Sequence, residues 1–350
     1  MQLVTNNLKN PTLSWQKEYK NSLKTIEQVN SFFGLHLPVE LSYKVFLPLT
    51  FAQRIKDAGL ESILAKQFIP AIDEASESGL LDPIGDKVQS KNDGIIHRYH
   101  NRILFTPTVN CPVICRYCFR KNELSNNDKI YQHKLLALKD YLILHPEVNE
   151  VILTGGDPLI LSNEKLKEIF NLLSKMNIKF LRLHTRTPII LPQRIDDSFL
   201  ELLNEFENQF TKIIFSLHVN HVEEINDEVE FALNKLRRTR ISKKTQTVLL
   251  KDINNNAETL IELFNKLIDL DFTPYYLHHP DKVKGAMHFS LPLEEGRQIY
   301  SKLRKFLPGW AVPHYVIDQF QGRGKQLAFN PEAFAYAGKM IDMDGNFCEY

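Results

Sequence analysis

Residues 150–184 read EVILTGGDPLILSNEKLKEIFNLLSKMNIKFLRLH, and the pattern in these letters predicts one repeating unit of the architecture. The apolar run EVILT has the length of a buried strand, and the apolar residues of NEKLKEIFNLLSKM recur with the period of a helix. A second strand-like run, KFLRLH, closes the stretch. Two strands joined by a helix within about 30 residues lie parallel in one sheet.

The same unit recurs on both sides of this stretch. Strand-like runs precede it at 103–108 and follow it at 212–218, 245–250 and 273–278, with helical patterns between the later ones. We expect Asn163 and Asn256 to be the N-cap residues of two of these helices. Six strands in this rhythm predict an α/β protein built as a partial (β/α)6, TIM-like barrel.

We predict that the barrel occupies residues 96–300. Residues 1–95 contain helix-like stretches separated by Pro38, Pro48, Pro70 and Pro83, which indicates a mostly helical N-terminal region with no obvious reaction of its own. Residues 301–350 form a short C-terminal segment. The barrel is therefore expected to carry most of the chemistry.

The composition excludes several classes of protein. Lys and Arg number 43 against 42 Asp and Glu among 350 residues, so a net charge of +1 offers no field that would attract nucleic acid. No apolar run approaches the roughly 18 residues of a membrane span, and residues 1–11 lack the apolar core of a signal peptide. We expect a cytoplasmic protein without a nucleic-acid or membrane partner.

Polar side chains follow successive strands at the end where such a barrel places its reaction. Besides cysteines after the first strand, they comprise Gly155-Gly156-Asp157, His184-Thr185-Arg186, His218 with Asn220 and His221, and His278 with His279 and Asp281. The carboxyl ends of parallel strands meet at one edge of a barrel. These residues therefore predict one site at the barrel mouth.

Three of the four cysteines lie close together. Cys111, Cys115 and Cys118 have the spacing CxxxCxxC directly after the first strand. Three thiolates can hold three irons of a [4Fe–4S] cluster and leave the fourth iron open to a small ligand. Zinc or plain buried thiols are the alternatives, but structural zinc usually takes four protein ligands, and Cys348 lies far along the chain. The spacing favours the cluster.

Four further motifs are RYHNR at 98–102, TQTVLL at 245–250, HPDKVKG at 279–285 and DQFQGRGK at 318–325. Together with the cysteine motif and GGDP at 155–158, they resemble the radical S-adenosylmethionine (SAM) superfamily and, more closely, the lysine 2,3-aminomutase family. The resemblance extends from about Gly94 to Lys325. It implies a barrel of the radical SAM type, a [4Fe–4S] cluster whose open iron binds SAM, and pyridoxal 5′-phosphate (PLP).

The resemblance assigns residues to the SAM site. Gly155, Gly156 and Asp157 match the family's turn beside the amino group of SAM. Glycine suits this place because backbone atoms can approach a ligand closely where a Cβ atom would clash. Gln246 matches a family position near the cofactors.

Other matches concern PLP. Arg98, Tyr99 and Arg102 match the segment that contacts this cofactor, where arginines suit the phosphate group and a tyrosine suits the pyridine ring. Lys325 matches the lysine to which PLP attaches. A lysine amine can react in this way only while part of its population is neutral.

Three residues bear on the substrate. Arg120 matches the arginine that receives the substrate carboxylate, and Asp281 and Asp318 match two acids that hold the distal ammonium group of lysine. The resemblance therefore implies an L-lysine 2,3-aminomutase, an isomerase that interconverts L-lysine and β-lysine. The alternatives are a radical SAM aminomutase of another amino acid, a radical SAM protein without PLP, and a non-catalytic metal-binding module.

The resemblance also bears on partners. It implies a reducing flavodoxin- or ferredoxin-type donor, is compatible with a homo-oligomer, and includes a branch that makes β-lysine for elongation factor P. The best-known aminomutases carry several C-terminal cysteines that bind an intersubunit zinc, whereas Cys348 stands alone in this tail. The resemblance therefore does not extend to that zinc site.

Overall fold

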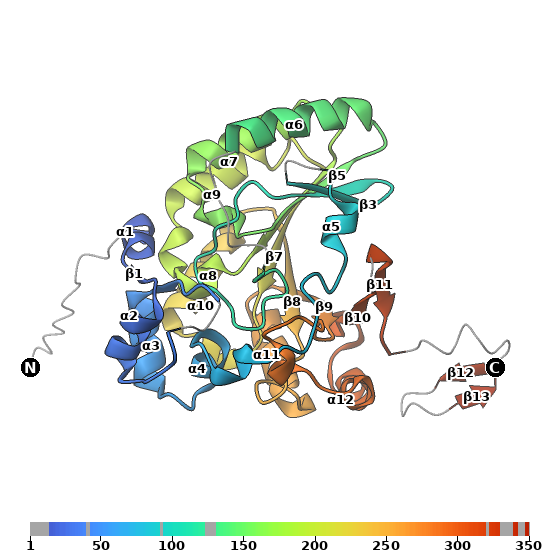
Figure 1. Cartoon of the computed structure of the whole chain (residues 1–350). Helices are drawn as coiled ribbons and strands as arrows, with labels where there is room; N and C mark the ends of the chain where they lie inside the picture. Colours follow the sequence, from blue (N-terminus) through green and yellow to red (C-terminus); the bar gives the residue numbers. More distant parts are fainter. Residues whose placement is uncertain are drawn as a thin grey trace, which may run out of the picture.

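The architecture is that of a parallel sheet enclosed by helices (Figure 1). The computed structural model describes residues 14–39, 43–91, 94–122, 131–319, 322–329, 339–341 and 347–349. Six strands follow one another in sequence order and are all parallel. They are β4 (Arg102–Phe105), β5 (Glu150–Leu153), β6 (Phe180–Thr185), β7 (Lys212–His218), β8 (Ser242–Val248) and β9 (Thr273–His278). Each overlaps a predicted run, so the α/β class and the partial barrel are confirmed.

The sheet also contains three strands beyond the six predicted for the barrel, and one of them overlaps the strand-like run VPHYVI at 312–317. Strand β3 (Ile95–Tyr99) pairs antiparallel with β4, so RYHNR forms part of a hairpin and does not simply precede the first strand. At the other edge, β10 (His314–Gln319) lies parallel to β9, and β11 (Gly324–Leu327) returns antiparallel to β10. The nine strands therefore run in the order β11-β10-β9-β8-β7-β6-β5-β4-β3.

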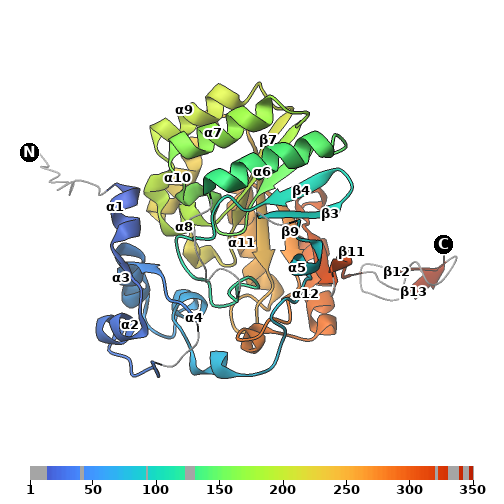
Figure 2. The same ribbon diagram turned by 45° about the horizontal axis from the view of Figure 1, so that its top comes forward.

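Helices cover the outer side of this sheet (Figure 2). The crossover helices are α6 (Tyr131–Leu144), α7 (Asn163–Ser174), α9 (Asp197–Phe206), α10 (Asp227–Lys235), α11 (Ala257–Asp269) and α12 (Leu293–Phe306), with the short α8 (Thr187–Ile190) after β6. Among the described residues, no helix has both the length and the apolar character needed to cross a bilayer.

The first four helices of the N-terminal region pack along one flank of the barrel in both views, whereas the fifth lies apart from them, beside β3 (Figures 1 and 2). The helices of this region are α1 (Trp15–Lys20), α2 (Ile26–Phe33), α3 (Leu49–Ala58), α4 (Ile63–Phe68) and α5 (Asp86–Gln89), and β1 (Ser22–Leu23) pairs with β2 (Leu47–Pro48). Near the C-terminus, β12 (Lys339–Ile341) pairs with β13 (Phe347–Glu349). The side chain of Cys348 lies outside the described part of the structure.

The two N-cap predictions have different outcomes. The side chain of Asn256 accepts a hydrogen bond from the backbone N–H of Thr259 at 2.8 Å, which confirms it as the N-cap of α11. Asn163 is the first helical residue of α7, so that prediction was wrong by one position. The hydroxyl of Ser162 caps this helix, while the side-chain amide of Asn163 donates to Ser198.

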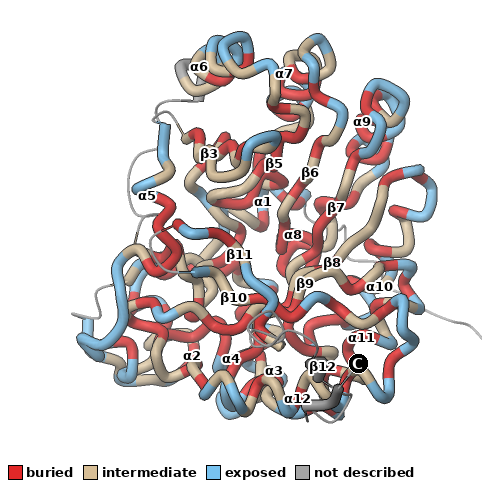
Figure 3. Tube along the Cα trace, turned by 90° about the vertical axis from the view of Figure 1, so that its right-hand side faces the viewer, coloured by how far each residue is buried: buried red, intermediate tan, exposed pale blue. Residues whose placement is uncertain are grey.

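The strands bury one side against the helices and direct the other toward the barrel interior. In β6, Leu181 and Leu183 are fully buried, whereas the intervening Arg182 and His184 line a cavity. Figure 3 shows buried residues concentrated along the strands and exposed residues on the outer turns of α7 and α9. Apolar packing thus fixes the barrel, and the alternation of a strand delivers polar side chains to its interior.

Candidate active site

A cavity at the carboxyl ends of the strands forms the candidate site. Every residue that the sequence singled out for cofactor, metal or substrate lines it. These residues are Arg98, Tyr99, Arg102, Cys111, Cys115, Cys118, Arg120, Gly155, Gly156, Asp157, Gln246, Asp281, Asp318 and Lys325. Segments from nearly the whole length of the barrel thus meet at one place, as expected for this architecture.

The cysteines form one wall of this cavity. Cys111, Cys115 and Cys118 are free thiols on the loop between β4 and α6, and burial raises the pKa of each, that of Cys118 to about 11. Among the described residues, no three His, Cys, Asp or Glu side chains converge so as to hold a single metal ion. A [4Fe–4S] cluster does not need such convergence, because each cysteine binds a different iron atom.

The glycine turn after β5 packs directly on the chain that leads into the cysteine loop. Gly155 has φ +100°, and a Cβ atom there would lie 2.1 Å from Cγ2 of Thr106. A Cβ atom on Gly156 would lie 2.1 Å from the carbonyl oxygen of Asn110. The N–H of Gly156 donates to the carbonyl of Thr108 at 3.0 Å. Packing within the protein therefore requires glycine at both positions, whether or not a ligand is bound.

Asp157 uses its carboxylate to fasten this turn to the end of β6. The carboxylate accepts hydrogen bonds from the backbone N–H groups of Leu159, Arg186 and Thr187 at 3.0, 2.7 and 2.9 Å, and from the hydroxyl of Thr185. Burial raises the pKa of Asp157, and these donors oppose the rise. The side chain of Asp157 thus positions the glycine turn, a role that the sequence match alone did not reveal.

Replacing Gly156 with alanine tests this packing. We expect the added methyl group to displace the cysteine loop and to lower the free energy of unfolding by about 1–3 kcal/mol, a typical cost of overpacking. Chemical denaturation measures the change, and iron content after anaerobic reconstitution should fall in parallel. Gly309→Ala is the matched control, because a Cβ atom there meets nothing within 4 Å and should shift stability by less than about 0.5 kcal/mol. Equal effects of the two substitutions would contradict the packing argument.

Two arginines of the site share one buried carboxylate. Asp86, on α5, accepts from Nε and Nη2 of Arg120 at 3.0 and 2.6 Å, and from Nη2 of Arg98 at 3.1 Å. Nη1 of Arg120 also donates to the hydroxyl of Thr154 at 3.3 Å. Sequence reasoning missed Asp86, because it lies in the N-terminal region that showed no motif. The structure makes it the residue that holds both guanidinium groups in place.

Lys325 and the two acids also line this cavity. Nζ of Lys325 lies 2.5 Å from Asp318, whose carboxylate also lies 3.8 Å from His278 and 3.7 Å from Arg98. Burial alone would raise the pKa of Asp318, but His278 and Lys325 hold it well below its usual range. Burial, and next the charge of Asp318, raise the pKa of Asp281 to about 7. The two acids therefore differ strongly in their affinity for a proton.

Tyr99 links the two edges of the sheet across the site. Its hydroxyl accepts a hydrogen bond from the backbone N–H of Lys325 at 2.9 Å, which joins β3 to β11. The guanidinium carbon of Arg102 lies 4.0 Å from the centre of the Tyr99 ring. Gly324 has φ +88°, and a Cβ atom there would lie 3.0 Å from the Tyr99 hydroxyl. The close approach of these edges thus depends on a glycine beside the lysine.

Known proteins resemble this chain over most of its length. The profile of the Radical SAM superfamily matches residues 105–267. The L-lysine 2,3-aminomutase of Escherichia coli strain K12 is 36% identical over 274 residues, covering 76% of this chain and 78% of that protein. The L-lysine 2,3-aminomutase of Haemophilus influenzae is 35% identical, with 90% of this chain and 91% of the relative covered. The chain belongs to the lysine 2,3-aminomutase family. The L-lysine 2,3-aminomutase of Buchnera aphidicola is 32% identical, with 92% of this chain and 97% of that protein covered.

As a member of the lysine 2,3-aminomutase family, the chain is a radical SAM isomerase with aminomutase activity. Membership implies a [4Fe–4S] cluster, SAM and PLP as cofactors. The residues fit these groups: thiols line one wall, and two guanidinium groups and an amine lie where an anionic aldehyde could bind. Nε of Arg98 and Oδ1 of Asp318 are also buried without a hydrogen-bond partner among the described residues, and both residues line this cavity.

Proposed function

We propose that this protein is an L-lysine 2,3-aminomutase that interconverts L-lysine and β-lysine. The supporting observation is the charge of the cavity lining, which combines the guanidinium of Arg120 with the carboxylates of Asp281 and Asp318. An amino acid with a carboxylate at one end and an ammonium group at the other complements these charges. A substrate with an acidic or apolar tail would offer these carboxylates no ammonium group. Among the described residues, Asp318 would keep only the longer ion pair with Arg98, at 3.7 Å, once Lys325 is engaged, which is costly.

Arg120 is the proposed receptor of the substrate carboxylate. Its planar guanidinium suits a bidentate pair with a carboxylate, and such pairs are both stronger and more directional than neutral hydrogen bonds. Asp86 binds two of its nitrogens and thereby fixes the orientation of the plane. The substrate would therefore meet a preorganised donor, which reduces the entropy lost on binding.

Asp318 is the proposed receptor of the distal ammonium group, together with Asp281. In the structure the ammonium of Lys325 already lies against Asp318, so this carboxylate accepts an alkylammonium group without rearrangement. Attachment of Lys325 to PLP would release Asp318 for the ammonium of the substrate. Arg98, Arg102 and Tyr99 would hold the phosphate and ring of PLP, and Gln246 would face the cofactors from β8.

Cysteines 111, 115 and 118 would hold the cluster, and the glycine turn beside them would hold SAM. When bound, the cluster and SAM supply a radical that removes a hydrogen atom from the substrate, and PLP supplies the carbonyl carbon that carries the migrating nitrogen. The protein contributes fixed distances and exclusion of water, both of which a radical reaction requires.

Anaerobic incubation of the reconstituted protein with SAM, PLP, dithionite and L-lysine tests the proposal. We expect β-lysine in the amino-acid analysis, and no product from glutamate or alanine under the same conditions. Rearrangement of another amino acid but not of lysine would show a different aminomutase. SAM cleavage without any rearranged product would indicate a radical SAM enzyme of another kind, and zinc in place of iron would indicate a metal-binding module.

The raised pKa of Asp281 predicts a pH dependence of substrate capture. Below its pKa of about 7 this acid is neutral and cannot attract an ammonium group, whereas above it the carboxylate can. We therefore expect kcat/KM for lysine to rise with pH, by up to about tenfold per unit below the pKa, and to level off above it. Asp281→Asn should give a lower value of kcat/KM with this rise removed. If kcat/KM of Asp281→Asn rose with pH by the same factor, the pH dependence would belong to another titrating group.

The proposal extends to the cellular setting. The cysteines require a reducing compartment, which supports the cytoplasm. A flavodoxin- or ferredoxin-type protein would reduce the cluster, and the chain would form a homo-oligomer, which light scattering can measure. The sequence CRYCFR at 115–120 resembles that of the branch that makes β-lysine for elongation factor P, which supports this use of the product. The mass of that factor should fall by one β-lysyl group when the gene for this chain is deleted.

A further inference from the structure

We propose that Arg186 sets the reduction potential of the cluster held by Cys111, Cys115 and Cys118, by fixing a positive charge and two N–H donors against the cysteine loop. This makes Arg186 a positioning residue for electron transfer. The inference rests on the cluster and is independent of the choice of substrate.

Arg186 follows directly after β6 and is 5% exposed. Its backbone N–H donates to Asp157 at 2.7 Å, which anchors it beside the glycine turn. Its guanidinium carbon lies 4.8 Å from the ring centre of Phe68 and 5.5 Å from that of Tyr117. Tyr117 lies between the second and third cysteines of the motif, and Arg186 lines the same cavity as Cys115. The guanidinium thus lies against the cysteine loop.

Only one nitrogen of this guanidinium has partners among the described residues. Nη2 donates to Gln67 at 3.1 Å and forms an ion pair with Glu224, whereas Nε and Nη1 are buried and have no hydrogen-bond partner there. A buried N–H group without an acceptor destabilises the folded protein, because it has lost its hydrogen bonds to water. Arg186 has two such N–H-bearing nitrogens, and it lines the cofactor cavity. We infer that their acceptor belongs to the cofactor. The sulfur atoms of an iron–sulfur cluster are such acceptors.

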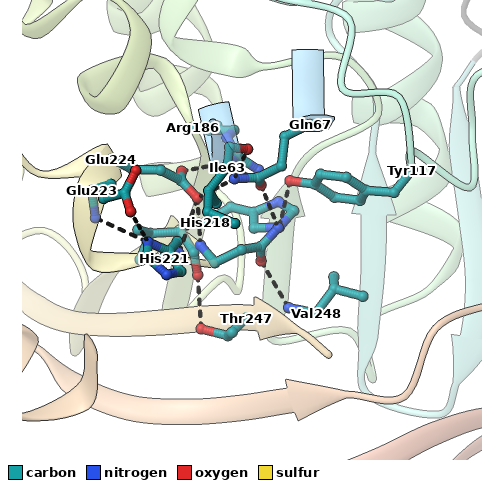
Figure 4. A network of polar contacts seen from close by, with 12 residues as sticks. Ile63, Gln67, Tyr117, Arg186, His218, His221, Glu223, Glu224, Thr247 and Val248 are labelled. Atoms are coloured by element: carbon teal, nitrogen blue, oxygen red, sulfur yellow. Dashed lines mark hydrogen bonds and ion pairs between the residues drawn. The ribbon is translucent and has the colours of Figure 1, made fainter. Parts of the chain in front are cut away.

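A buried network holds the guanidinium in this orientation (Figure 4). Glu224 is fully buried and accepts from the backbone N–H groups of Asn220 and His221 at 3.0 and 3.1 Å and from the side chain of Gln67 at 3.1 Å. The carbonyl of Gln67 in turn accepts from the backbone N–H of Arg116, inside the cysteine motif, at 2.9 Å. The network therefore joins the guanidinium and the cysteine loop into one rigid unit.

The electrostatic effect has a definite sign. Reduction adds one electron to the cluster, so a nearby cation and N–H donors stabilise the reduced form and raise the potential. Glu224 places the opposite charge directly beside the guanidinium, so its effect on the potential has the opposite sign. Removing Arg186 should therefore lower the potential, and neutralising Glu224 should raise it.

The test is an anaerobic redox titration of the reconstituted holoprotein, followed by electron paramagnetic resonance of the reduced cluster and run without lysine or PLP. For Arg186→Gln we expect the ratio of reduced to oxidised cluster at a given potential to fall at least tenfold, which is 59 mV for one electron. Glu224→Gln should shift the potential upward. Arg186→Lys keeps the charge and loses the fork of donors, so its potential should lie between those of Arg186→Gln and the unmodified protein. Arg238→Gln, an exposed arginine paired with Asp197, is the control for net charge and should not shift it.

Iron and sulfide analyses identify the variants that keep a full cluster. If Arg186→Gln fails to bind the cluster, Arg186→Lys and Glu224→Gln still decide the question, since their expected shifts have opposite signs. An unchanged potential in the variants that retain the cluster would overturn the inference. A shift that appears only when SAM is present would also overturn it, because the donors would then serve SAM and not the cluster. Failure to form β-lysine has no bearing on these titrations.

Discussion

Replacing Lys325 with alanine is expected to abolish formation of β-lysine while the protein stays folded. The side chain is 30% exposed at the cavity and, within the described part of the chain, its one ion pair is with Asp318, so little packing is lost. Its amine is the proposed attachment point of PLP. Loss of a group that bonds covalently to the cofactor and transfers a proton is expected to lower the rate by about a hundredfold to ten-thousandfold or more. The visible absorbance of protein-bound PLP should disappear in the same variant. Amino-acid analysis and an absorption spectrum measure both effects.

Lys282→Ala is the matched control for this substitution. Lys282 is an exposed lysine one residue after Asp281, so its removal changes the same net charge near the same site without touching the cavity wall. We expect normal activity and normal absorbance from it. If Lys325→Ala retained the PLP absorbance, another amine would carry the cofactor. In that case the position of Lys325 beside Asp318 would be only an ion pair.

The sequence predicted the strands whose pattern is local. Strands β5 to β9 are apolar or alternating runs, and each begins within three residues of its predicted start. The period of a buried strand depends only on neighbouring residues, so the sequence can reveal it. Strands β3 and β11 are short edge strands that contain Arg98, Tyr99 and Lys325, and their apolar pattern is weak. Pairing partners hold such strands in place, and a local pattern does not identify those partners.

The predicted residues came together, but their interactions did not follow from the sequence. The hairpin of β10 and β11 places Lys325 directly opposite Asp318 in register, which no spacing rule required. The carboxylate of Asp157 accepts several backbone hydrogen bonds. Residues 106 and 110 occupy the space that a Cβ atom would need on each of the two preceding glycines. Contacts of this kind depend on how distant segments approach one another, and a motif carries no information about that approach.

The largest omission was the N-terminal region. Its Asp86 holds Arg120, and its Leu80 pairs with Val283 in the segment after Asp281. The ammonium of Lys121, three residues after the last cysteine of the motif, donates to the carbonyl of Gly285 at 2.6 Å. The N-terminal region and the cysteine loop therefore hold the segment that carries a proposed substrate acid. A region without a motif of its own thus shapes the site.

Glu74 is the residue on which this arrangement depends most. It is 3% exposed and accepts from Nε of Arg116 at 2.7 Å and from Nζ of Lys121 at 3.0 Å, and both cations are themselves buried. Burial would raise its pKa, but the two cations hold the pKa below the usual value. Glu74→Gln would leave two buried cations without an ion-pair partner among the residues that the structure describes. We therefore expect the free energy of unfolding to fall by about 3–5 kcal/mol, as measured by chemical denaturation at neutral pH.

The pH dependence and a matched control separate this effect from a general loss of charge. Because the folded-state pKa of Glu74 is lowered, its contribution is present above the ordinary pKa of a glutamate and is lost as the pH falls through the folded value. The stability difference between Glu74→Gln and the unmodified protein should therefore shrink in acid. Glu205→Gln breaks an exposed pair with Lys167 and should cost no more than about 1 kcal/mol. A comparable loss in both variants would mean that the buried cluster contributes no more than a surface ion pair, and Lys121 would then need another reason for its burial.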